Sequence, residues 1–166
     1  MSEAQLVRYE THGDVAVIVV DNPPVNALSP GVDDGILDGL AKANADAAVK
    51  AVVLIGAGRS FIAGADIRQF GKRPPRPPAL ERAHVIIEQS KKPIVAAIHG
   101  YALGGGLEYA LACHYRIAAA EARVGLPEVL IGAIPGGGGT QRLPRLIGPR
   151  AEIGRASCRE RVSPRV

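Results

Sequence analysis

The sequence predicts an α/β fold, because apolar runs of strand length alternate with stretches of helical periodicity. Residues 51–55 and 94–98 are continuous apolar blocks, too short for buried helices and well suited to buried strands. Each block is followed, after a loop, by apolar residues at helical spacing, over residues 80–89 and 107–112. A chain of 166 residues with 47% hydrophobic content fits one domain and can bury a core.

The chain before these blocks predicts a hairpin and a helix. The hairpin is expected over residues 6–20, with a glycine turn at residues 12–14. The helix is expected over residues 30–47, with Ser29 as its cap and Pro30 at its first position. The predicted buried face of this helix consists of Val32, Ile36, Leu37 and Leu40.

The second half of the chain predicts one amphipathic helix and three shorter elements. In the helix over residues 80–89, Val85 and Ile86 are expected to face the core. His84 is expected at the surface or its boundary, and His99 is expected to pack at a strand end. Two short strands and a last helix are expected over residues 115–119, 123–126 and 140–147.

Charge and composition argue against a nucleic-acid-binding protein and against a metal centre. The net charge is +4, but five arginines and two glutamates within residues 150–166 account for +3 of it. The rest of the chain has no basic stripe with interleaved aromatic residues. Cys113 and Cys158 form no disulfide framework and lack metal-ligand spacing with a histidine.

A cytoplasmic protein without a membrane span is expected. Residues 1–5 are polar, unlike the apolar region of a secretory signal. No apolar run approaches the length needed to cross a bilayer. The last residues, 163–166, do not form a peroxisomal address.

The stretch from Ile94 to Glu108 predicts a site that accepts negative charge. A buried strand leads to Gly100 and to a glycine triplet at residues 104–106, after which a helix begins. Glycine lets another group approach the backbone closely. The first amides of a helix have no internal partner and lie at the positive end of its dipole. Strand, glycine loop and helix start together favour binding of an anion.

Two glutamates accompany this loop. Glu108 falls in the first turn of the predicted helix, where an acid can simply complement the dipole. Glu128 follows twenty residues later, and its flanking residues Leu126, Pro127 and Val129 to Ile131 are an unusual setting for a solvated acid. Two acids in apolar surroundings beside free amides indicate a general acid/base pair.

A second loop, over residues 60–67, contains the small residues Ala63, Gly64 and Ala65. Taken alone, it is read as a tight turn. Beside the glycine triplet it suggests a second amide donor, so that two donors straddle one oxygen. Gly56-Ala57-Gly58 resembles the start of a dinucleotide loop, but the third glycine and the immediate helix are missing.

Four motifs carry a resemblance to the enoyl-CoA hydratase/isomerase family, the crotonases. The signature is Ala96-Ala97-Ile98-x-Gly100-x-Ala102-x-Gly104-Gly105-Gly106-x-Glu108. Residues 22–28, 61–67 and 134–143 agree with it in the family's order, and the likeness runs from about residue 15 to residue 149. Residues 106–117 are most similar to the hydratase part of bifunctional hydratase/3-hydroxyacyl-CoA dehydrogenases.

The resemblance implies a crotonase-like spiral of repeated β-β-α units over residues 1–150, incomplete at its C-terminus. Residues 151–166 are unlike the family and are expected to be a foreign or disordered tail. The family fold implies a trimer or hexamer for a complete domain. Residues 68–78 are basic and proline-rich, and are expected either to meet the phosphates of coenzyme A or to be merely solvated.

The resemblance also implies roles for individual residues. Glu108 and Glu128 become the catalytic acids, and Ala65 and Gly105 supply the oxyanion-hole amides. The expected contacts to the acyl-CoA are Asn26, Ala27, Leu28, Ala63, Gly64, Asp66, Ile67, Gly104, Pro135 and Gly136. No metal and no separate cofactor are expected, since coenzyme A arrives as part of the substrate.

The expected activity is hydration of 2-enoyl-CoA to 3-hydroxyacyl-CoA in fatty acid β-oxidation. Two alternatives stay open: a Δ3-Δ2-enoyl-CoA isomerase, and an inactive fragment that binds acyl-CoA. A serine hydrolase is disfavoured because the chain has no Gly-x-Ser-x-Gly.

Overall fold

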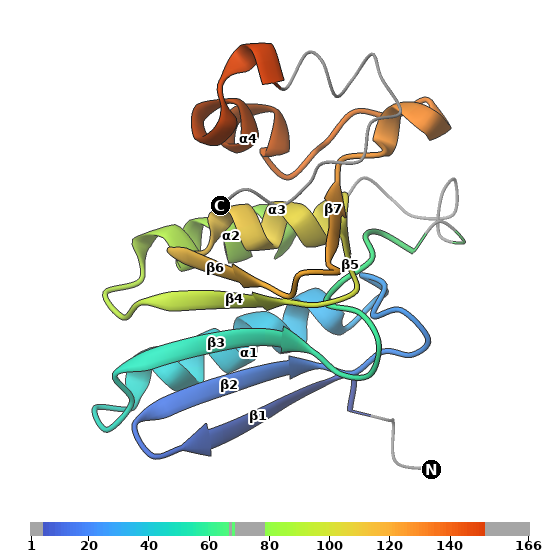
Figure 1. Ribbon diagram of the computed structural model, residues 1–166. Helices are drawn as coiled ribbons and strands as arrows, with labels where there is room; N and C mark the ends of the chain where they lie inside the picture. Colours follow the sequence, from blue (N-terminus) through green and yellow to red (C-terminus); the bar gives the residue numbers. More distant parts are fainter. Residues whose placement is uncertain (1–4, 67, 69–78, 152–166) are drawn as a thin grey trace.

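The main sheet has five strands in the order β1-β2-β3-β4-β6 (Figure 1). This computed structural model describes residues 5–66, 68 and 79–151. The strands are β1 (Val7–His12), β2 (Val15–Val20), β3 (Ala51–Gly56), β4 (Ile94–Ile98) and β6 (Tyr115–Ala118). The first two form the predicted antiparallel hairpin, and every later neighbour is parallel.

A smaller sheet runs across one end of the main sheet. It pairs β5 (Tyr101–Leu103) with β7 (Arg123–Gly125) in parallel. Isolated parallel bridges extend the same path, joining Leu28 to Ala65 and Ile62 to Ala102. Each pass of the chain therefore adds a long strand to the main sheet and a short segment to the small one. This repeat is the predicted spiral of β-β-α units.

The helices cover one face of the main sheet. They are α1 (Val32–Ala45), α2 (Ala79–Gln89) and α3 (Gly105–Ala112), with α4 (Gly139–Ile147) after the short 3₁₀ helix η2 (Glu128–Ile131). Helix α1 packs on β1 and β2, and α3 packs on β4. Helix α4 packs on α3, on the side away from the main sheet (Figure 1). The core lies between the sheet and the first three helices and is filled mainly by Ala, Val, Ile and Leu.

The predicted start of the first helix was wrong. Helix α1 begins at Val32, and its N-cap is Gly31 at φ 91°, not Ser29. A left-handed residue there favours glycine and turns the chain after Pro30. The predicted buried face is largely confirmed, because Val32, Ile36 and Leu40 are buried while Leu37 is half-buried.

The orientation of α2 also differs from the prediction. Ile86 is half-buried and packs against the core as predicted, but Val85 is 46% exposed. Ile87 and His84 face the core instead, with His84 only 2% exposed. The ring of His84 packs edge-on against Tyr109, with centroids 4.8 Å apart. An aromatic partner inside the core explains why this histidine is buried.

Three predictions fall partly or wholly outside the described residues. These concern Ile67, the basic loop at residues 69–78, and the tail at residues 152–166. Among the helices that the structure describes, none is long and apolar enough to cross a membrane.

Candidate active site

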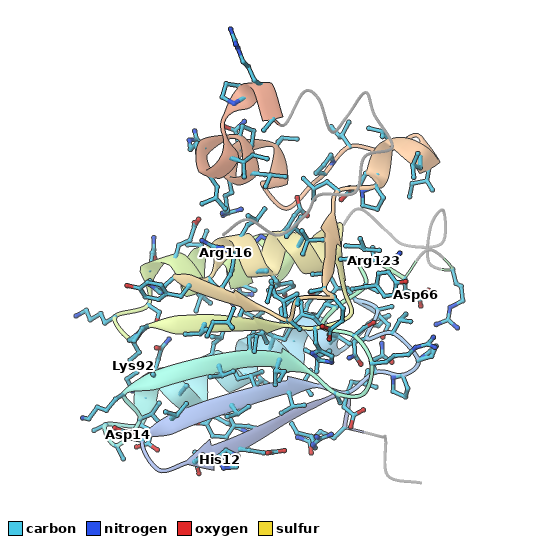
Figure 2. The ribbon with its side chains drawn as sticks, viewed as in Figure 1. His12, Asp14, Asp66, Lys92, Arg116 and Arg123 are labelled. Atoms are coloured by element: carbon cyan, nitrogen blue, oxygen red, sulfur yellow. The ribbon has the colours of Figure 1, made fainter. Side chains whose placement is uncertain are left out.

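The candidate site lies where the carboxyl ends of β3 and β4 meet the small sheet. The loop after β3 carries residues 57–66, and the loop after β4 leads through β5 into α3. In Figure 2, Asp66 lies at this end of the molecule, whereas Lys92 and Asp14 lie at the opposite end. Loops at the carboxyl ends of parallel strands are a common position for ligand sites in α/β folds.

The two predicted amide-bearing segments lie side by side. Ile62 bridges Ala102 in parallel, and Leu103 N donates to Ile62 O at 3.1 Å. Further along the first segment, a β-carbon on Gly64 would lie 2.9 Å from Leu103 O. The main chains are thus in direct contact, as the sequence hypothesis of two facing loops requires.

The amides of Ala65 and Gly105 donate to no residue that the structure describes. In the bridge to Leu28, Leu28 N donates to Gly64 O and Asp66 N donates to Leu28 O. Ala65 N therefore points away from Leu28, by the geometry of a parallel pair. Gly105 N is the first amide of α3 and has no acceptor within the helix. Both donors are available at the junction of the two segments.

Glycine is required at this junction for steric reasons. Gly104 has φ 52° and ψ −125°, a conformation that residues with a side chain rarely adopt. At Gly106, a β-carbon would lie 2.0 Å from Ile62 O. The glycines of the triplet thus let the start of α3 approach the loop that carries Ala65.

Glu108 is buried and held by a second glycine loop. Its side chain is 1% exposed, and Oε1 accepts hydrogen bonds from Gly137 N at 2.7 Å and from Gly139 N at 2.8 Å. Its own amide donates to Gly104 O at 3.0 Å. The helix dipole alone therefore does not explain the position of Glu108, because two amides from a distant segment orient its carboxylate.

Glu128 approaches the same helix start from the other side. A β-carbon on Gly104 would lie 3.1 Å from Glu128 Oε1, and Gly104 N bonds Gly125 O at 2.9 Å. The predicted apolar frame around Glu128 is confirmed only in part: Leu126 and Pro127 are half-buried, whereas Val129, Leu130 and Ile131 are exposed. Glu128 itself is half-buried, with Oε1 beside Gly104. Both glutamates thus contact residues at the amino end of α3.

The side chain of Asn26 ties loops together. Asn26 has φ 55° and is buried, and its Nδ2 donates to Ala57 O at 2.8 Å and to Ser60 O at 2.7 Å. Its Oδ1 accepts from Asn22 N at 2.9 Å. These bonds occupy the side-chain amide of Asn26, so only its main chain is left to contact a ligand. Its contact with the ligand stays a prediction.

Some of the other predicted binding residues lie where the segment of Ala65 meets the start of α3, and others lie further out. Leu28 is buried against Gly105, whose added β-carbon would lie 2.8 Å from Leu28 Cδ1. Asp66 is buried and accepts hydrogen bonds from Nε and Nη2 of Arg68 at 2.9 and 3.0 Å. Ala27, Ala63 and Pro135 are half-buried, and Gly136 is exposed.

Sequence reasoning missed the partners of Glu108. In the sequence, Gly137 and Gly139 stand out only as part of the motif over residues 134–143, although their amides bind the carboxylate of Glu108. His84 also lines this loop, because a β-carbon on Gly137 would lie 2.7 Å from His84 Cε1. The one available signal was the run of four glycines itself, which permits such close contacts.

Comparison with known proteins identifies the family. The family model described as enoyl-CoA hydratase/isomerase matches residues 10–158. The chain belongs to this family. The resemblance carried by the four motifs is thereby confirmed.

Two curated relatives show how much of the family's proteins this chain spans. It is 54% identical over 144 residues to the human peroxisomal bifunctional enzyme, covering 86% of this chain and 20% of that protein. It is 48% identical over 140 residues to a probable enoyl-CoA hydratase of Bacillus subtilis (strain 168), covering 81% of this chain and 54% of that protein. The chain thus spans a fifth to about half of these relatives.

A solved structure confirms the crotonase fold. The enoyl-CoA hydratase of Bacillus anthracis superposes with a TM-score of 0.85 at 36% identity, covering 96% of this chain and 65% of that one. The cytoplasmic location stays a prediction, since the relatives named above include a protein described as peroxisomal.

Proposed function

We propose that this family member hydrates 2-enoyl-CoA thioesters, as a step of fatty acid β-oxidation. The observation that carries the proposal is the gathering of two glutamates and two amide donors around one helix start. Glu108 lies in the first turn of α3, Glu128 Oε1 lies beside Gly104, and Gly105 and Ala65 present their amides at the same helix start.

The reaction adds water across the α,β double bond. Hydroxide attack at the β-carbon moves electron density onto the thioester oxygen, giving an enolate. The amides of Ala65 and Gly105 stabilise this oxygen, and one such donor typically accounts for about 3 kcal/mol of transition-state stabilisation. Glu108 accepts the proton of the attacking water. Glu128 orients that water and delivers a proton to the α-carbon, which gives the 3-hydroxyacyl thioester.

This chemistry requires proton transfer and charge stabilisation only. Hydration exchanges no electrons with a cofactor, and coenzyme A enters as part of the substrate. We assign the coenzyme and acyl group to the region of the predicted binding residues Asn26, Ala27, Leu28, Asp66 and Gly136. Ile67, by its place in the sequence, is assigned with them.

The family description also covers isomerases, which move one proton between two carbons and need one acid. The approach of Glu128 to Gly104 favours hydratase, since a second carboxylate is then available at the helix start. An inactive acyl-CoA-binding fragment is the third possibility, because the chain spans only part of its relatives.

One experiment separates these three functions. The purified chain is incubated with crotonyl-CoA and, separately, with a 3-enoyl-CoA in water enriched in ¹⁸O. Incorporation of ¹⁸O into 3-hydroxybutyryl-CoA supports the hydratase. Migration of the double bond without ¹⁸O incorporation indicates the isomerase. Binding of crotonyl-CoA with no turnover of either substrate indicates the inactive fragment.

A further inference from the structure

Arg142 connects two helices to the glycine loop that binds Glu108. Its Nε donates to Glu88 Oε1 of α2 at 2.6 Å. Its Nη1 donates to Gly137 O at 2.7 Å. One guanidinium on α4 thus bonds both a carboxylate and a main-chain carbonyl at the start of its own helix.

The bonded carbonyl lies between the two amides that hold Glu108. Gly137 N and Gly139 N both donate to Glu108 Oε1, and Gly137 O lies in the peptide bond between them. Gly138, the middle residue, has φ 91° and is the N-cap of α4, so this turn depends on glycine. A bond to Gly137 O therefore restrains the peptide whose neighbours orient the catalytic carboxylate.

Arginine suits this position better than lysine. A guanidinium presents several N–H donors in a rigid plane and can bind two acceptors in different directions. A lysine ammonium is a point charge on a flexible stem and does not hold both partners in fixed geometry. Glu88 anchors the plane through a charge-assisted hydrogen bond, which is stronger than a neutral one.

We propose that Arg142, anchored by Glu88, is a positioning residue for Glu108. It acts through the loop of residues 137–139 and not by contact with the reacting atoms. The proposal rests on the proposed function only for its kinetic consequence. Its structural part, the restraint of the two amides, can be measured in an inactive chain.

The experiment compares three variants with a matched control. Arg142→Gln removes both the charge and the planar set of N–H donors. Arg142→Lys keeps the charge only. Glu88→Gln weakens the hydrogen bond that holds the Arg142 guanidinium. The control is Arg145→Gln, because Arg145 lies on the same helix and its Nη1 bonds only Gln141 O, within that helix, among the described residues. Each protein is assayed for hydration of crotonyl-CoA and for hydrogen exchange of the Gly137 and Gly139 amides.

We expect Arg142→Gln to lower kcat about 10- to 100-fold with KM little changed, since small misplacements of a catalytic group cost this much. Amide exchange at Gly137 and Gly139 should accelerate. In Arg142→Lys and in Glu88→Gln, the loss of kcat and the acceleration of amide exchange should both be smaller than in Arg142→Gln. Arg145→Gln should change neither.

Unchanged amide exchange in Arg142→Gln and Glu88→Gln would overturn the proposal, whatever the activity. A rise in KM with kcat preserved would also overturn it, by assigning Arg142 to substrate binding. If the wild-type chain has no hydratase activity, the proposed function fails, and the exchange measurement still decides whether Arg142 restrains the loop. If Arg142→Gln does not fold, Glu88→Gln supplies the same comparison.

Discussion

Glu128 is the residue at which the proposed chemistry is most directly tested. Because glutamine has nearly the same shape and Glu128 is only half-buried, Glu128→Gln should preserve the fold. A glutamine cannot deliver a proton, so we expect kcat for crotonyl-CoA to fall about 10²- to 10⁴-fold. The affinity for acyl-CoA, measured by calorimetry, should be largely unchanged.

The matched control for this substitution is Glu121→Gln, since Glu121 is an exposed acid in the preceding turn. It should keep full activity. Equal losses of affinity and rate in Glu128→Gln would assign Glu128 a structural role.

Burial of Cys113 should make its thiol unreactive in the folded protein. Desolvation raises the pKa of its thiol to about 12, although nearby Arg116 opposes the shift. The thiolate is the reactive form, so Cys113 should not react with iodoacetamide at pH 8 in the folded protein. A Cys158→Ser variant, which leaves Cys113 as the one thiol in the chain, should be labelled only in denaturant. Labelling at equal rates with and without denaturant would contradict this expectation.

At the scale of elements, the contact between α2 and α4 should depend on pH. The hydrogen bond from Arg142 lowers the pKa of Glu88 below its ordinary value of 4.5, and burial opposes the shift. A lowered pKa in the folded state means that stability is present above the ordinary pKa and is lost as the pH falls through the folded one. Glu88 is 45% exposed, so solvent screening limits the contribution to less than about 1 kcal/mol.

Glu88→Gln should therefore lower the Tm slightly at pH 7, and the difference from wild type should shrink below pH 4.5. Thermal unfolding followed by circular dichroism over this range measures it. A difference that grows as the pH falls would show that another group controls acid stability.

The close contact of α3 with the loop after β3 predicts an unusual helix substitution. Alanine normally stabilises a helix relative to glycine. At Gly106, however, the added β-carbon would lie 2.0 Å from Ile62 O, a main-chain atom that cannot rotate away. We expect Gly106→Ala to cost about 1–3 kcal/mol in urea unfolding, the usual penalty of overpacking.

The comparison is Gly39→Ala in α1, where the added β-carbon would meet the side chain of Ile18 at 3.0 Å. That side chain can adjust, so the cost should be smaller. Equal free energies of unfolding for the two variants would contradict the steric account.

Elements with a strong periodic signal were predictable, and those set by tertiary contact were not. The strands β2, β3 and β4 are apolar runs bounded by turns, and all three were found near their predicted bounds. Helix α1 started late because Gly31 takes a left-handed conformation, which the pattern of Ser29 and Pro30 does not reveal. The prediction for His84 was wrong because its burial depends on Tyr109, which lies on the next helix, α3, outside the local sequence pattern.

The candidate site was predictable in its residues and less so in its contacts. The glycine triplet and the acids Glu108 and Glu128 could be read from residue type and spacing. That Gly137 and Gly139 bind Glu108 could not be read, because hydrogen bonds between segments 29 and 31 residues apart leave no local pattern. The roles of these residues in catalysis stay predictions.

At the scale of the whole molecule, apolar side chains are concentrated on the surface of the last third of the described chain. Leu130 and Ile134 are each 81% exposed, and Val129, Ile131 and Leu146 are also exposed. Residues so exposed contribute little to folding, and exposed apolar patches promote association. Leu130→Ser with Ile134→Ser should change the free energy of unfolding by less than about 0.5 kcal/mol.

The same double variant should reduce concentration-dependent association in analytical ultracentrifugation. Loss of several kcal/mol of stability would instead show that these side chains are covered within the folded chain.

The contact between residues 62–65 and residues 102–105 is made by main-chain atoms alone at its tightest points. The interval between the amides of Ala65 and Gly105 is therefore a property of chain spacing, not of the side chains around it. Substitution of the surrounding side chains should therefore leave this interval unchanged. Under the proposed function, the same pair of amides would serve different acyl groups as the surrounding side chains change.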